Sequence, residues 1–201
     1  FAVLPFPEEY KIGDVYSMIV FGLNAEDFEY AYQIDGPYDP DRGLIFDKNA
    51  IILDPYARAV SGQRIWGKQM RSHYRARVVR DMFDWGDAPQ SSRELSDLVI
   101  YELHVRGFTQ HASSGVRHPG TFEGLKEKIP YLKDLGINAV ELMPIFEFDE
   151  TMNAREVDGR KLLDYWGYNS VCFFAPNSSY AASVEYNVEG TELKELIREL
   201  H

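Results

Sequence analysis

The residues best suited to chemistry form an aromatic group, in which Tyr165 and Trp166 precede Gly167 and Tyr168 follows it. Tyrosine and tryptophan combine a flat apolar face with a polar tip, so they can stack on ring-shaped ligands such as sugars. The glycine allows a tight backbone between the large rings. The same rings would equally serve as a hydrophobic anchor packed under a loop, so the residue types leave both interpretations open.

A second candidate group consists of three carboxylates, Glu147, Asp149 and Glu150. Glycosidic hydrolysis uses two carboxyl groups, one that protonates the leaving oxygen and one that attacks or activates water. The chain carries 32 acidic residues against 21 basic ones, a net charge of −11, so acidic loops are expected on its surface. A solvated acidic loop is therefore the prediction for residues 147–150.

The sequence lacks the common motifs for phosphates and metals. It has no glycine-rich phosphate-binding loop, and its five histidines never fall in the His-Glu-x-x-His spacing. Residues 39–43 begin like a calcium loop, but their glycine comes one position early and the distal glutamate is missing, which predicts a plain turn. We expect no metal and no organic cofactor.

Charge and cysteine content exclude other classes of protein. The acidic balance argues against nucleic acid and anionic membrane surfaces as partners. No apolar run approaches the ~18 residues that a membrane helix needs. A single cysteine excludes an internal disulfide framework, and because Cys172 lies in an apolar run we expect it to be buried and unreactive.

The first part of the chain, residues 1–90, is typical of a small antiparallel β module. Partial alternation and aromatic or β-branched residues predict strands over 15–20 and 28–34, and a third strand is expected over 50–53. A polar, turn-rich stretch at 86–96 predicts a linker.

The pattern after the linker predicts a βαβ unit. A nearly continuous apolar strand at 98–105 is followed by apolar residues at helical spacing, with Thr121 as the cap and Gly136 as the stop. Pro130 should bend or split that helix. A second strand at 137–143 implies a parallel pair, with Glu102 and Glu141 inside the two strands. The segment 144–190 shows no helical period and is expected to be a long functional loop, followed by a helix capped by Thr191.

Motifs spread along the chain carry a family resemblance. They are residues 32–38 (YQIDGPY), 53–57 (LDPYA), 101–109 (YELHVRGFT), 119–122 (PGTF), 132–144 (LKDLGINAVELMP), 165–169 (YWGYN) and 173–176 (FFAP). In this order the chain resembles the α-amylase superfamily of glycoside hydrolases, and within it the isoamylase and glycogen-debranching branch. The resemblance implies a multidomain fold: a β-sandwich, carbohydrate-binding-like module over 1–90, then the start of a (β/α)8 TIM barrel over 91–201, truncated after about two barrel strands.

The resemblance also implies a function, that of a retaining glycoside hydrolase that cleaves α-1,6 branch points in glycogen- or starch-type α-glucans. By motif position, Tyr168 is expected to stack on the sugar at the cleavage subsite, and Trp166 and Tyr165 to shape that subsite. The family's catalytic aspartate and glutamate would follow His201, so the resemblance assigns no catalytic residue to this chain. We expect the protein to be located in a bacterial cytoplasm, with a plant plastid as the alternative.

Two other functions fit the same motifs. One is a branching enzyme or another α-glucanase of the superfamily, and the other is a non-catalytic subunit that binds α-glucan. Because the chain starts at Phe1 without methionine and ends inside a helical pattern, we expect it to be a piece of a longer protein. Two barrel strands leave open edges, so we expect the piece to be unstable alone.

Overall fold

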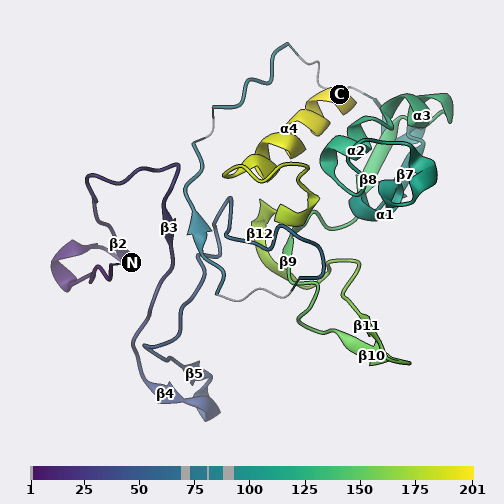
Figure 1. The fold of residues 1–201 in the computed structure, drawn as a ribbon. Helices are drawn as coiled ribbons and strands as arrows, with labels where there is room; N and C mark the ends of the chain where they lie inside the picture. The colour runs from purple at the N-terminus through teal and green to yellow at the C-terminus, as the bar shows by residue number, and fades with distance from the viewer. Residues whose placement is uncertain (1, 69–72, 81, 88–92) are drawn as a thin grey trace.

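The structure, a computed structural model, describes residues 2–68, 73–80, 82–87 and 93–201 of the 201-residue chain. In Figure 1 the N-terminal region runs as extended segments and short strand pairs, whereas helices α1 to α4 lie in the second half of the chain. No helix within these described ranges is long and apolar enough to cross a bilayer.

The N-terminal region forms antiparallel pairs of two strands each. The pairs are β1 (Lys11–Ile12) with β2 (Val15–Tyr16), β3 (Glu29–Tyr30) with β6 (Ala76–Arg77), and β4 (Tyr38–Asp39) with β5 (Leu44–Ile45). Two 3-10 helices accompany them, η1 (Glu8–Tyr10) and η2 (Pro40–Arg42). The turn expected over residues 39–43 is confirmed, because η2 ends at Gly43 in the left-handed conformation, with φ +74°, and leads from β4 into β5.

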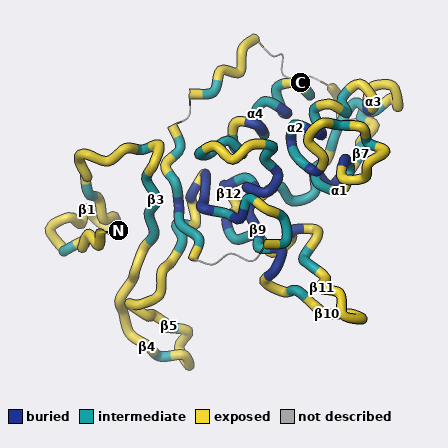
Figure 2. The backbone as a smooth tube through the Cα atoms, viewed as in Figure 1, coloured by how far each residue is buried: buried dark blue, intermediate teal, exposed yellow. Residues whose placement is uncertain are grey.

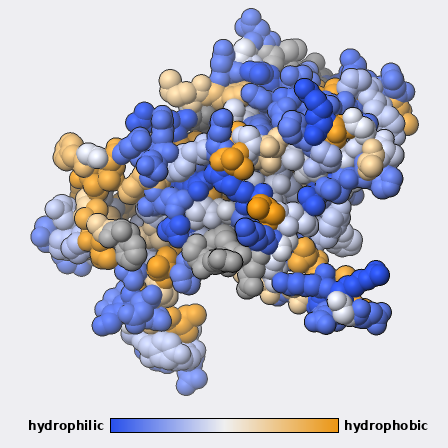
Figure 3. All heavy atoms as spheres, viewed as in Figure 1, coloured by the Kyte–Doolittle hydropathy of each residue, from blue (hydrophilic) through white to orange (hydrophobic). Residues whose placement is uncertain are grey.

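The strands expected over 15–20, 28–34 and 50–53 are shorter than predicted. The first two contain the two-residue strands β2 and β3, and the third contributes one isolated bridge, in which Tyr32 and Ile52 exchange two backbone hydrogen bonds of 2.8 Å. A strand extends only as far as a neighbour satisfies its N–H and C=O groups. Hydrophobic alternation therefore overestimates the length of these strands where no neighbouring strand pairs with them. Figure 3 shows hydrophobic side chains gathered on the surface around β1 and β2.

The predicted βαβ unit is confirmed, with corrected bounds. Strand β7 (Ile100–Leu103) pairs in parallel with β8 (Ala139–Leu142). The first strand ends earlier than expected, because His104 caps a helix that begins at the next residue. Between the strands lie α1 (Val105–Gln110), η4 (Ala112–Ser114), α2 (Phe122–Lys126) and α3 (Ile129–Asp134). Of the expected linker 86–96, residues 88–92 lie outside the described residues, and η3 (Leu95–Asp97) follows them.

The helix signals between the two strands are also confirmed. The Thr121 hydroxyl accepts the Gly124 amide at 3.1 Å and caps α2. Pro130 separates α2 from α3, where it stands in the first turn and no amide donor is required of it. Gly136 follows α3 with φ +83°, the left-handed conformation that ends a helix.

The segment expected to be a long loop contains four strands and a 3-10 helix. They are β9 (Phe146–Phe148), β10 (Arg155–Val157), β11 (Arg160–Leu162), β12 (Ser170–Pro176) and η5 (Ser178–Tyr180). Strand β12 pairs antiparallel with β9, while β10 and β11 form a hairpin that projects from the body of the molecule in Figure 1. The last helix, α4 (Val188–Leu200), begins after Asn187, so the expected cap at Thr191 is wrong.

Two clusters of buried residues hold the elements together. The larger joins β7, α1, α2, β9 and η5 to α4 and contains Leu103, Val105, Phe122, Leu125, Phe148, Tyr180 and Leu196. The smaller joins Ala57, Val60 and Ala76 to two residues of β12, Cys172 and Ala175. Figure 2 shows buried stretches of backbone in and around β9 and β12. Cys172 is buried as expected, and its thiol donates to the Ala57 carbonyl at 3.1 Å.

Candidate functional site

The aromatic group lies between the β10–β11 hairpin and β12, beside a surface cleft of about 480 Å³. The cleft brings together all three aromatic residues singled out from the sequence, Tyr165, Trp166 and Tyr168. Their exposed fractions are 44%, 62% and 68%. The rings of Trp166 and Tyr168 stand nearly perpendicular, with centroids 6.4 Å apart. Two flat, exposed faces therefore border one cavity, an arrangement suited to stacking on a ligand.

The other side of the cleft mixes polar and apolar groups. It is lined from the hairpin by Arg155 and Leu162, which face each other across β10 and β11, and near the base of the hairpin by Asn153 and Asp164. The Asp164 amide donates to the Glu150 carbonyl at 2.8 Å, which closes that base. The cleft thus combines apolar faces with charged and amide groups that can bond hydroxyls.

Gly167 fixes the backbone between the exposed rings. Its φ is +80°, and a Cβ atom there would lie 2.6 Å from Cε1 of Phe148. Phe148 is fully buried in the larger core cluster. A glycine is required here on two grounds, the left-handed conformation and the close approach of the core.

Tyr165 plays a different part from its two neighbours, because its ring packs inward. It stacks on the His104 imidazole, with centroids 4.3 Å apart and planes 10° apart, and meets the edge of Trp66 at 5.9 Å. Its hydroxyl lies over Gly107, where a Cβ atom would clash with it. The Arg106 guanidinium covers the Trp66 ring at 4.7 Å. Tyr165 therefore acts as the packed anchor, whereas Trp166 and Tyr168 present the exposed faces suited to stacking.

The prediction of a solvated acidic loop at residues 147–150 is wrong. Glu147 and Glu150 are fully buried, whereas Asp149 is partly buried and accepts the Thr151 amide at 2.8 Å and the Thr151 hydroxyl at 2.6 Å. Strand β9 runs into the protein interior and carries its glutamate with it. The reason lies in distant contacts, since the Ser178 amide donates to Glu147 Oε2 at 2.7 Å.

Burial makes both glutamates reluctant to ionise. Desolvation raises the pKa of Glu147 to about 8, although the hydrogen bonds from Ser178 oppose the shift. Desolvation likewise raises the pKa of Glu150 to about 7, and the Ser179 hydroxyl donates to Glu150 Oε1 at 3.1 Å. Both side chains are closed off from solvent, so a ligand in the cleft cannot touch them in this structure. Glu147 instead contacts Ser178, and Glu150 reaches the cleft only through its carbonyl, which accepts the Asp164 amide.

Glu102 and Glu141 do not complete a catalytic pair in this structure. Glu102 and Glu141 oppose each other in the register of β7 and β8, and both are exposed. Across the described part of the chain, no group of three or more His, Cys, Asp or Glu side chains could hold a metal ion.

Residue types alone did not single out His104, Trp66 or Arg155 as parts of the site. His104 lies inside the strand predicted over 98–105 and Arg155 in a segment without periodicity, so neither position indicated a role in the site. Trp66 comes from the N-terminal half of the chain, and only the tertiary fold places it under Tyr165.

No family model matches the chain. Among curated proteins, the chloroplastic isoamylase 3 of Oryza sativa subsp. japonica is 42% identical over 200 residues, which are 95% of this chain and 26% of that protein. The glycogen debranching enzyme of Salmonella paratyphi B is 31% identical over 205 residues, 94% of this chain and 30% of that protein. The chain is homologous to the isoamylase and glycogen-debranching branch of the α-amylase superfamily. The resemblance carried by its motifs is confirmed.

Solved structures agree with this homology. The type I pullulanase of Bacillus subtilis strain 168, solved in complex with maltose, matches with a TM-score of 0.58 and 30% identity over 78% of this chain and 22% of that one. A pullulanase from Anoxybacillus sp. LM18-11, complexed with maltotriose, matches with a TM-score of 0.51 and 31% identity over 75% of this chain and 22% of that one. The chain spans about a quarter of the length of its debranching relatives.

Proposed function

We propose that the chain is part of an α-1,6 debranching glycoside hydrolase, and that its cleft binds the glucose units of a glycogen- or starch-type α-glucan. Relatives named isoamylase and glycogen debranching enzyme align with nearly all of it. The pullulanase that it resembles in fold was solved with maltose, a short α-glucan.

The observation that carries the proposal is the cleft itself. Exposed Trp166 and Tyr168 present two aromatic faces to one cavity. Glucose rings have apolar faces that stack on such side chains and hydroxyls that bond to polar neighbours. Arg155 supplies donors and Asp164 an acceptor at the same cavity. We propose that Tyr168 stacks on the sugar at the cleavage subsite, while Trp166 and Tyr165 shape that subsite.

The proposal extends to domain organisation. Residues 1–90 would belong to a β-sandwich module and residues 91–201 would begin a (β/α)8 barrel. The parallel pair β7–β8, joined through α2 and α3, supports the barrel, since a barrel is built from such units. The catalytic aspartate and glutamate would come from other parts of the whole protein. We place the whole protein in a bacterial cytoplasm or a plastid, since one relative is bacterial and another is named chloroplastic.

Incubation of the full-length protein with amylopectin, glycogen and pullulan tests this function. We expect release of linear chains from amylopectin and cleavage of pullulan at its α-1,6 bonds. Cleavage confined to α-1,4 bonds, or transfer that creates new branches, would assign the protein to another enzyme of the superfamily. Binding of amylopectin without any cleavage would assign it to the glucan-binding subunits.

A further inference from the structure

His104 connects the aromatic group to the βαβ unit through both of its ring nitrogens. Its Nδ1 accepts the Gly107 amide at 3.0 Å, which caps α1. Its Nε2 lies 2.6 Å from the carbonyl oxygen of Tyr165, 61 residues later in the chain. The side chain is only 8% exposed. One imidazole thus joins two distant segments at the inner side of the cleft.

The two contacts specify the protonation state of the ring. Because a backbone amide can only donate, Nδ1 must be the bare, accepting nitrogen. Because a backbone carbonyl can only accept, Nε2 must carry the proton and donate to Tyr165. The neutral Nε2–H tautomer satisfies both contacts. The Tyr180 hydroxyl lies 3.2 Å from the same Nε2 and encloses it further.

We propose that His104 is a positioning residue for glucan binding, whose neutral imidazole holds the Tyr165 backbone and ring in place and so shapes the cleft. This inference rests on the proposed function of the cleft as the glucan site. The ring stack with Tyr165 and the Nε2–H bond act on the same residue, so both its side chain and its main chain are held. Tyr165 is followed directly by Trp166, so a shift of its carbonyl moves the exposed rings.

Protonation would break this arrangement. An imidazolium carries a second N–H, at Nδ1, and that group would face the Gly107 amide, which is also a donor. The titratable groups around the ring are the hydroxyls of Tyr165 and Tyr180 and the Arg106 guanidinium, with the Glu150 carboxyl acting on Arg106 and Tyr180. The positive charge of Arg106 opposes a second positive charge on the imidazole.

The pKa of His104 follows from the same surroundings. Burial lowers it below the ordinary 6.5, and Arg106 lowers it further, while the Tyr165 carbonyl opposes the shift. The neutral form therefore persists into mildly acidic solution. Glucan affinity should weaken only as the pH falls below 6.5 and the ring takes up a proton.

Maltotriose binding to the full-length protein and to its H104N variant tests the proposal. Asparagine keeps an oxygen near the position of Nδ1, so α1 remains capped, but it cannot reach Tyr165 or stack on it. We expect the Kd for maltotriose to rise about tenfold at neutral pH, as for the loss of one buried hydrogen bond and a ring contact. The wild-type affinity should weaken in acid, whereas that of H104N should lack this acid limb.

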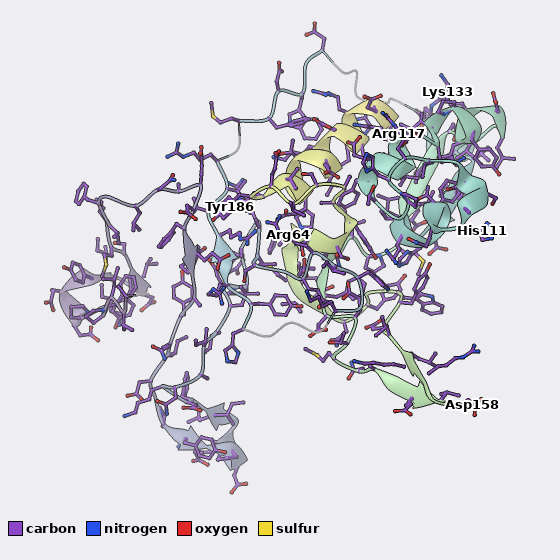
Figure 4. All side chains as sticks on the ribbon, viewed as in Figure 1. Arg64, His111, Arg117, Lys133, Asp158 and Tyr186 are labelled. Atoms are coloured by element: carbon purple, nitrogen blue, oxygen red, sulfur yellow. The ribbon has the colours of Figure 1, made fainter. Side chains whose placement is uncertain are left out.

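His111 provides the matched control. Its Nδ1 also accepts a backbone amide, that of Ser113 at 3.2 Å, and caps η4. Its side chain is exposed, and Figure 4 shows it at the outer edge of the α1 region. We expect H111N to bind maltotriose like the wild type and to retain the acid limb.

The outcomes separate this inference from the proposed function. A wild-type protein that neither binds maltotriose nor cleaves glucans would overturn the function. If the wild type binds maltotriose and H104N binds it equally well, or H104N retains the acid limb, the positioning role is overturned while the proposed function stands. If H104N does not fold, NMR of the wild type with isotope-labelled histidine decides. An Nε2–H tautomer of His104 whose pKa lies below the ordinary 6.5 supports the proposal, and an Nδ1–H tautomer overturns it.

Discussion

Replacing Gly167 with alanine would test whether the core holds the backbone of the cleft. The new Cβ would lie 2.6 Å from Cε1, 2.8 Å from Cδ1 and 3.1 Å from Cζ of Phe148. Phe148 has no room to retreat, since its ring contacts Trp66 and Tyr180 at centroid distances of 5.8 and 6.4 Å. The alanine must also adopt a φ of +80°. The substitution therefore opposes both the conformation and the packing of this segment.

The two costs can be estimated and separated. A left-handed conformation costs a residue with a Cβ roughly 1–2 kcal/mol. Overpacking of a well-filled core costs roughly 1–3 kcal/mol more. Gly159 provides the matched control, because its φ is +74° and a Cβ there would meet no atom within 4 Å. G159A should therefore show the conformational cost alone, and G167A should exceed it by the roughly 1–3 kcal/mol of packing.

Hydrogen exchange of the full-length protein measures this difference locally. Relative to the wild type, G167A should accelerate exchange at residues 164–169, and G159A should accelerate it at residues 157–160. The first acceleration should exceed the second by roughly 5- to 150-fold, the equivalent of 1–3 kcal/mol. We also expect weaker maltotriose binding in G167A and wild-type binding in G159A. Equal acceleration at the two sites, with unchanged maltotriose affinity, would refute the argument that contact with Phe148 holds the cleft.

Three further substitutions test other parts of the structure. Y168A in the full-length enzyme should lower kcat/KM on a branched glucan by roughly 10- to 100-fold, because a lost stacking ring costs about 1–3 kcal/mol, and unchanged kinetics would leave Tyr168 a packing role only. Native Glu147, with its pKa of about 8, keeps a proton that the unfolded chain loses near 4.5, so its contribution to stability falls as the pH rises between these values. E147Q should remove this pH dependence of stability. In thermal unfolding, the stability of E147Q relative to the wild type should be higher at about pH 9 than at about pH 5. An equal stability difference at the two pH values would contradict the raised pKa. F122A should destabilise the core by about 3–5 kcal/mol in urea unfolding, since Phe122 is fully buried with its ring edge-on to Tyr180, and a loss under about 1 kcal/mol would contradict the assigned packing.

The βαβ unit could be predicted from sequence because its signals are local. Thr121 accepts an amide three residues away, Pro130 lies in the first turn of α3 and separates it from α2, and Gly136 follows the end of α3. Each of these effects acts within about one helical turn, a range over which the neighbouring sequence decides the conformation. The parallel pairing then follows, because two buried strands joined by a helix need a crossover.

The N-terminal strands could not be predicted as well, since their length depends on partners. Strand β3 pairs with β6, in which Arg77 lies opposite Glu29 and Ala76 lies opposite Tyr30. Arg75 and Arg77, 46 and 48 positions after Glu29, donate hydrogen bonds to its carboxylate. Alternating hydrophobicity shows that a segment suits a strand, but it does not show where another segment supplies hydrogen bonds. The same argument applies to β9 and β12, because the absence of helical periodicity over 144–190 predicts a loop and gives no sign of their pairing.

The buried glutamates show why composition misled the prediction for residues 147–150. In an acidic chain a run of carboxylates predicts solvation, because an unpaired buried charge is costly. Glu147 avoids that cost by remaining protonated and by accepting the Ser178 amide. Gly62 makes the space, since a Cβ there would overlap both Glu147 and Ser178. Neither contact has a signature near residue 147 in the sequence.

The aromatic group shows what sequence can establish about a site and where tertiary structure takes over. The residue types at 165–168 allowed either stacking on a ligand or packing under a loop, and the structure divides these roles within four residues. Tyr165 faces inward because His104 and Trp66 offer it rings to pack on. Trp166 and Tyr168 face outward because Gly167 is pressed against Phe148 and turns the backbone between them. The partners that decide each orientation come from separate parts of the chain, so the stacking surface is a property of the assembled core.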